Sequence, residues 1–199
     1  MTQPEPAAPE SRAPAGSTGR TESRSERIRK AVRQIGWELD HSESWQIPPG
    51  DVAALRRSRP GDVGGPAFWK VAVRHLDPAG LLPSADHPER DDLERRWTTI
   101  LGGMAEMEGH HTGGVSLGRA LAGRSETDRP VSEARVLRLL DARGEALLRL
   151  VRPIAHLLAS RGTRLDWTDF ALLVLDDGST WEHKIRRRIA LDYYANLRR

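Results

Sequence analysis

GGVSLGRALAG occupies residues 113–123, and its interpretation separates an α/β fold from an all-helical one. Within it, residues 114–118 (GVSLG) match the G-x-S-x-G pattern of a nucleophile elbow, the sharp strand-to-helix turn that exposes a catalytic serine in α/β-hydrolases. In those enzymes an acid and then a histidine follow the serine along the chain. Here Asp166 or Asp176, and then His183, would complete such a triad.

The residues before Ser116 do not support a catalytic serine. A nucleophile elbow needs a buried strand that runs into it, whereas residues 107–114 read MEGHHTGG. The chain also lacks the alternation of strand and helix patterns that a parallel sheet requires. We therefore predict that Ser116 is the N-cap of a short helix, with its hydroxyl accepting a backbone N–H. We predict no catalytic residue.

The rest of the chain has the spacing of helices. Apolar residues recur three and four positions apart, which places them on one face of a helix. Pro153 lies inside one such segment, and we expect it to kink or restart that helix. The segments with this spacing are 28–39, 51–55 (capped by Asp51), 66–76, 88–107, 132–140, 145–160, 166–177 (capped by Asp166) and 181–197.

These segments predict an all-α fold of about eight to nine helices. We expect two small helical bundles, residues 24–110 and residues 111–199, and we expect the second to carry a basic face. Residues 1–23 are rich in Pro, Ala, Ser, Gly and charge and have no apolar period, so we predict a disordered N-terminal tail.

Composition excludes several classes of protein. The 199 residues include no cysteine, which excludes disulfides, zinc–thiolate sites and thiol nucleophiles. No apolar run approaches the roughly 20 residues of a membrane span, and no signal peptide is found, so we expect a cytoplasmic protein with no membrane contact. His110 and His111 are adjacent and point apart, and residues 113–119 lack the G-K-[ST] of a phosphate loop. We predict no metal, cofactor or small-molecule substrate.

Basic side chains gather on helix faces although the net charge is only +3. Because arginine presents a planar fork of donors that fits a phosphate, such faces indicate a nucleic-acid backbone as partner. The basic residues at helical spacing or at a helix end are Arg56, Arg57 and Arg59; Arg149, Arg152 and His156; and Lys184, Arg187 and Arg188, with Arg186 on the flank.

The order of several segments resembles the CasB family, the small subunit of the type I-E CRISPR surveillance complex Cascade. The segments are AALRRSRPGDVGGPAFWKV, GGVSLGRALAG, VSEARVLRLLDA, LDWTDFALLVLDD and a basic helix that ends in LDYY. The resemblance covers about residues 50–195.

This resemblance implies an all-helical, non-catalytic protein that lies as a pair of copies along the belly of the complex. There it would hold the separated single DNA strands of the R-loop. Its partners in the complex would also include the guide RNA and the other Cascade subunits. Asp141 stands where other members have a basic residue, so the basic track would pass through Arg143 instead. The nucleic-acid-binding residues that the resemblance implies are Arg57, Arg90, Arg143, Arg149, Arg152, Lys184, Arg186 and Arg187.

Two expectations complete the interpretation. Aromatic residues make up 5% of the chain, so we expect little stacking on bases, with Trp69, Trp97, Trp167 and Trp181 in the core. The alternative to the CRISPR function is a helix-turn-helix regulator, formed by residues 166–179 and the basic final helix. It predicts tight binding to one duplex sequence.

Overall fold

The computed structural model describes residues 22–41, 47–59, 62–123 and 129–197. Over these ranges the chain forms nine α-helices and no β-strand, which confirms the all-α prediction. The predicted tail lies outside the described residues except for its last two. The helices are α1 (Arg24–Asp40), α2 (Pro49–Arg57), α3 (Pro66–Val71), α4 (Arg90–Glu106), α5 (Leu117–Ala122), α6 (Glu133–Asp141), α7 (Gly144–Ser160), α8 (Thr168–Leu175) and α9 (Glu182–Asn196), and a π-helical turn (Ala72–Leu76) extends α3.

Capping residues fix where the helices begin. Ser23 and Glu26 form a capping box at α1, in which each side chain accepts the other residue's backbone N–H. Asp166 accepts the N–H of Thr168 at 3.0 Å just before α8, but the N-cap of that helix is Trp167, so the predicted cap lies one residue too early. The prediction that Asp51 caps a helix is wrong, because α2 already begins at Pro49. Asp51 instead forms a salt bridge with Lys70.

Helix α7 does not restart at Pro153. It runs as one α-helix from Gly144 to Ser160, and Pro153 lies on its exposed side. A proline cannot donate to the carbonyl four residues earlier, which belongs to Arg149. On the exposed side water can bind that carbonyl instead, and the helix continues.

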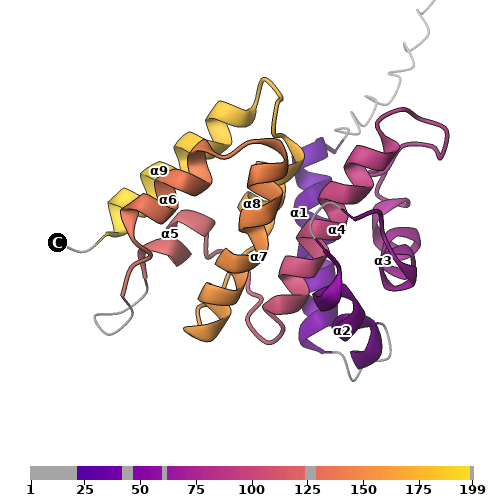
Figure 1. Ribbon diagram of the computed structural model, residues 1–199, viewed down its shortest axis with the longest axis horizontal. Coiled ribbons are helices and arrows are strands. Elements are labelled where there is room, and N and C mark those ends of the chain that lie inside the picture. Colours follow the sequence, from indigo (N-terminus) through magenta and orange to yellow (C-terminus); the bar gives the residue numbers. More distant parts are fainter. Residues whose placement is uncertain (1–21, 42–46, 60–61, 124–128, 198–199) are drawn as a thin grey trace, which may run out of the picture.

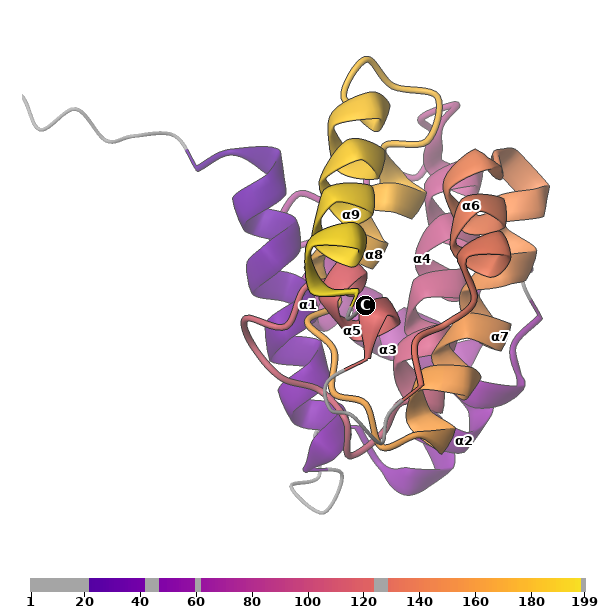
Figure 2. The same cartoon turned by 90° about the vertical axis from the view of Figure 1, so that its left-hand side faces the viewer.

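The helices pack in three groups across the molecule. Figure 1 shows α5, α6 and α9 at one side, α2 and α3 at the other, and α1, α4, α7 and α8 between them. Helix α4 packs on α7 and α8, α1 packs on α8, and α5 packs closely on α9. In Figure 2, turned by 90°, α1 lies on one side of α8 and α9, and α6 and α7 lie on the other.

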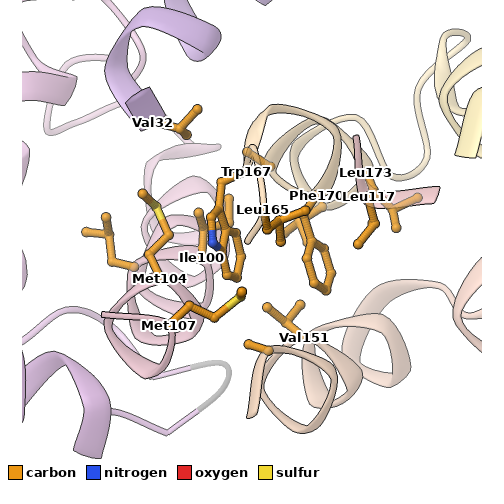
Figure 3. Packing of buried hydrophobic residues seen from close by; sticks show 14 of the residues in the cluster. Val32, Ile100, Met104, Met107, Leu117, Val151, Leu165, Trp167, Phe170 and Leu173 are labelled. Atoms are coloured by element: carbon orange, nitrogen blue, oxygen red, sulfur yellow. The ribbon is translucent and has the colours of Figure 1, made fainter. Parts of the chain in front are cut away.

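Buried side chains of both predicted bundles belong to one hydrophobic cluster. At its centre the rings of Trp167 and Phe170 stack with their centroids 5.0 Å apart, and Figure 3 shows Trp167 between Met104 and Phe170. Gly103 lets the Trp167 ring lie close to the backbone of α4, because a Cβ at that position would be 2.6 Å from the ring. The division into two bundles stays a prediction.

Two of the four tryptophans predicted to be in the core are not fully buried. Trp97 and Trp167 are buried, as predicted, with 1% and 2% exposure. Trp69 is 37% exposed and Trp181 is 59% exposed, so that prediction is wrong for both. Helical spacing places Trp181 in register with the buried stripe of α9, but Trp181 precedes the first residue of that helix and lies outside its packed part.

Candidate nucleic-acid interface

Arginines from two helices that are distant in sequence meet at the C-terminal end of α2. Arg152, in the middle of α7, donates from Nη1 to the backbone carbonyl of Ser58 at 3.0 Å. The residues on either side of Ser58, Arg57 and Arg59, are exposed. Arg149 lies one turn before Arg152, and its side chain is 73% exposed. We call Arg57, Arg59, Arg149 and Arg152 the α2–α7 surface.

Acidic groups compensate only part of this surface. Glu106 of α4 accepts from Nδ1 of His156 at 2.7 Å and lies 3.9 Å from Nε of Arg152. Glu145 lies 3.7 Å from Arg149, in an exposed pair of a kind that contributes little binding energy. No described carboxylate pairs with the side chain of Arg57 or Arg59. The surface therefore keeps cations that can bind phosphate.

The outer side of α9 presents a second set of cations. Lys184 and Arg187 are exposed, and within the described ranges neither has a carboxylate partner. The ammonium group of Lys184 lies 4.0 Å from the centre of the Trp181 ring. Arg188, in contrast, pairs with the buried Asp169 of α8. Helix α9 thus offers two cations to a ligand.

Arg186, predicted to bind nucleic acid, lies inside the protein. Its guanidinium contacts Oδ1 of Asp177 at 2.7 Å and Oε1 of Glu182 at 3.0 Å, and it donates to the carbonyl of Leu140 at 2.7 Å. Arg143 joins the same group through Glu182. We call Arg143, Asp177, Glu182 and Arg186 the Arg186 cluster. It ties the end of α6 and the start of α7 to the start of α9.

The Arg186 cluster favours the charged form of Glu182. Burial by itself would raise the pKa of Glu182, but the N–H of Gly178 at 2.8 Å and the guanidinium groups of Arg186 and Arg143 outweigh it. The pKa of Glu182 therefore lies below its ordinary value. The backbone N–H of Gly144 donates to Asp177 at 2.6 Å, so both acids are fully engaged.

Arg90 also makes internal contacts. Its side chain is 14% exposed, pairs with Glu94 one turn along α4 and lies 3.5 Å from Asp77. It donates to the carbonyl of Pro83, and its guanidinium lies 5.9 Å from the centre of the Trp69 ring. These contacts attach the loop before α4 to that helix.

The elbow-like pattern has a structural explanation. Ser116 is the N-cap of α5, as predicted, and its Oγ accepts the N–H of Arg119 at 3.3 Å. Gly114 has a φ of 87°, in the left-handed region that favours glycine. Gly118 lies against α9, where a Cβ would be 2.3 Å from the carbonyl oxygen of Ile189. The two glycines and the serine of the pattern therefore have structural roles, in the turn before α5, at its N-cap and in its packing on α9.

Sites of two other kinds are not found in the part of the chain that the structure describes. It holds no group of three His, Asp or Glu side chains that could bind a metal ion. None of its helices is long and apolar enough to cross a membrane.

A comparison with the models of known protein families shows to which family the chain belongs. Residues 51–194, more than two thirds of it, match the model of the CRISPR-associated protein Cse2. The chain belongs to the Cse2 family. Neither a curated protein nor a solved structure gives a match.

Membership of the Cse2 family, also called CasB, confirms the resemblance and makes the chain a subunit of type I-E Cascade. The matched span contains all eight predicted site residues and leaves α1 outside, although α1 packs on α8. The structure brings Arg152 of α7 to Ser58, beside Arg57, and Arg149 is exposed one turn away. Lys184 and Arg187 are exposed on α9. Arg90 and Arg186 make buried ion pairs, whereas Arg143 pairs with Glu182 but keeps a 45% exposed side chain.

Sequence reasoning left Arg59 and Trp181 out of the set for this Cse2-family chain. Arg59 was visible as a third arginine directly after α2. Trp181 could have been noticed as a large apolar residue at a helix N-cap, where Ser, Thr, Asp and Asn are usual.

Proposed function

We propose that this subunit binds DNA in Cascade, holds the separated single strands of the R-loop and performs no catalytic step. The observation that carries the proposal is the α2–α7 surface, where Arg152 contacts the carbonyl of Ser58 between Arg57 and Arg59. Cations from sequence positions far apart lie there, and acids compensate only part of their charge. Such convergence is expected of a surface that tracks a phosphate backbone.

The physical consequences follow from phosphate binding. Contacts to phosphates carry no sequence information, so binding should ignore sequence and weaken steeply with salt. The exchange of DNA–DNA for RNA–DNA pairs in an R-loop is nearly balanced in energy, as established for another CRISPR effector. Modest contacts to the released strand are therefore enough to favour the open state.

The proposal includes partners besides DNA. We expect a second copy of the chain, the guide RNA and the other Cascade subunits in the assembly, and membership of the Cse2 family supports the last of these. A cytoplasmic location follows from this assembly. Ser116, the residue that an enzymatic alternative would use, has its hydroxyl bound to the first turn of α5.

The test is a charge reversal within the assembled complex. The triple variant Arg57→Glu, Arg149→Glu and Arg187→Glu should assemble but release the displaced strand, and its salt slope on single-stranded DNA should fall by about 2. The matched control reverses Arg29, Lys30 and Arg95, which are exposed on α1 and α4 and change the net charge equally. Equal DNA retention by both variants would contradict the proposal, and tight binding of the wild type to one duplex sequence would favour the regulator.

A further inference from the structure

A groove of about 490 Å³ lies between the first turn of α1 and the start of α9. The apolar side chains of Leu172 and Ile185 line it, together with the exposed Trp181. Arg24, Lys184 and Arg188 also line it. An aromatic ring beside an apolar wall and several cations is the composition of a site for a flat, anionic ligand.

Folding does not account for Trp181 at this position. It precedes α9 as its N-cap without a capping side-chain bond, and 59% of it is exposed. Small polar residues would stabilise that position better than tryptophan does. Lys184 covers the ring from 4.0 Å, and the remaining surface of the ring is open to solvent.

The charges of the groove favour an anion. Its cations outnumber its single acid, Asp176, which pairs with Arg24. Arg188 is engaged by Asp169. Lys184 has no described carboxylate partner, so its charge is available beside the ring.

We propose that this groove binds one unpaired base of single-stranded DNA, with the base stacked on Trp181 and the adjoining phosphate on Lys184. The inference rests on the proposed function and adds a contact to the base itself. Every base has a π-face, so stacking on a tryptophan keeps binding independent of sequence. The volume of the groove suits a ligand the size of a nucleotide.

The experiment compares two oligomers of about 15 nucleotides, near the upper end of single-strand site sizes. One is oligothymidylate, and the other has the same sugar–phosphate backbone without bases. Trp181→Ala in the full-length chain should lower affinity for the thymidine oligomer about tenfold and leave the abasic oligomer unchanged, because only stacking is lost. Trp181→Phe keeps a ring and should retain most of the affinity, and Lys184→Gln should weaken both oligomers.

Trp37→Ala is the matched control, because Trp37 is 49% exposed on α1. It lies 13 residues after Arg24, which is about 20 Å along the helix. It should bind both oligomers as the wild type does. Thermal melting of each variant checks that the fold is intact, and a 5-iododeoxyuridine oligomer should crosslink to Trp181 on irradiation.

The outcomes separate this inference from the function on which it rests. If the wild type binds neither oligomer, the proposed DNA-binding function fails with it. If the wild type binds both oligomers equally and Trp181→Ala changes neither, the function stands and the stacking site is overturned. Loss of assembly with other Cascade subunits in Trp181→Ala, with DNA binding unchanged, would assign the groove to a protein partner and equally overturn it.

Discussion

Arg186 and Arg187 are neighbours in α9, yet they have opposite environments. Arg186 is buried among Asp177, Glu182 and the carbonyl of Leu140, whereas Arg187 is exposed and has no described carboxylate partner. Adjacent residues on a helix diverge by about 100°. One arginine therefore joins α6, α9 and the turn after α8, and the next is available to a partner.

The contrast extends to the two groups of basic residues. In the Arg186 cluster the positive charges are compensated by two acids and several backbone groups, so removing Arg186 takes the main partner from two buried carboxylates. On the α2–α7 surface each arginine can be removed without uncovering a buried charge. A basic residue is thus a candidate for binding only when its charge is not already used by the fold.

The largest expected effect is on stability and comes from Arg186→Met. We expect the free energy of unfolding to fall by about 3–5 kcal/mol, because Asp177 and Glu182 would remain buried without their main partner. Urea denaturation of the purified chain measures this. Arg187→Met, the control next to it, should change stability by less than about 0.5 kcal/mol. Similar losses in the two variants would contradict the contrast.

A smaller effect, with a defined pH dependence, is expected for Glu182→Gln. At pH 7 the variant should lose about 2 kcal/mol, the scale of hydrogen bonds to a charged group. The pKa of Glu182 in the folded chain lies below its ordinary 4.5, so its contribution is complete above pH 4.5 and is lost as the pH falls through the folded value. Unfolding measured from pH 7 to pH 3 should show the two curves converging below pH 4.5, and a constant difference throughout would disprove the assignment.

The smallest effects on stability, and the clearest on binding, are expected for Arg57→Gln and Arg149→Gln made singly. Each should leave the unfolding free energy within about 0.5 kcal/mol of the wild type, because both side chains are exposed. Each should reduce the slope of log affinity against log salt on single-stranded DNA by about 0.7, one phosphate contact. A salt titration checks this, and unchanged slopes would remove these arginines from the interface.

The period of the apolar residues was enough to predict the all-α class, and the capping of α5 by Ser116 followed from the absence of a strand before it. The fate of individual arginines could not be predicted in the same way. The spacing of Glu182 and Arg186 indicates an ion pair on a helix surface, but its burial depends on Asp177 and on the end of α6. Those contacts arise only in the tertiary structure.

For the α2–α7 surface, too, the sequence predicts part of the arrangement and not the rest. Arg149 and Arg152 share a polar face by helical spacing, and the sequence shows this directly. That α7 brings them to Ser58 depends on how α4 packs between α2 and α7. The prediction that Trp181 is in the core was wrong for a local reason. Its sequence spacing matches the buried face of α9, but Trp181 lies just before that helix, where the spacing no longer determines where the side chain points.

Gly118 has a consequence for the orientation of α9. Its Cα lies against the backbone of α9 from Ile189 to Tyr193, with no space for a methyl group. A helix in backbone contact with its neighbour cannot turn about its own axis without a clash, unlike a helix seated on flexible side chains. The close contact at Gly118 therefore prevents α9 from rotating about its axis. Because the side chain of Gly118 is a hydrogen atom and not a carbon, α5 can approach α9 this closely, and this contact sets the angle at which α9 presents Arg187 to solvent.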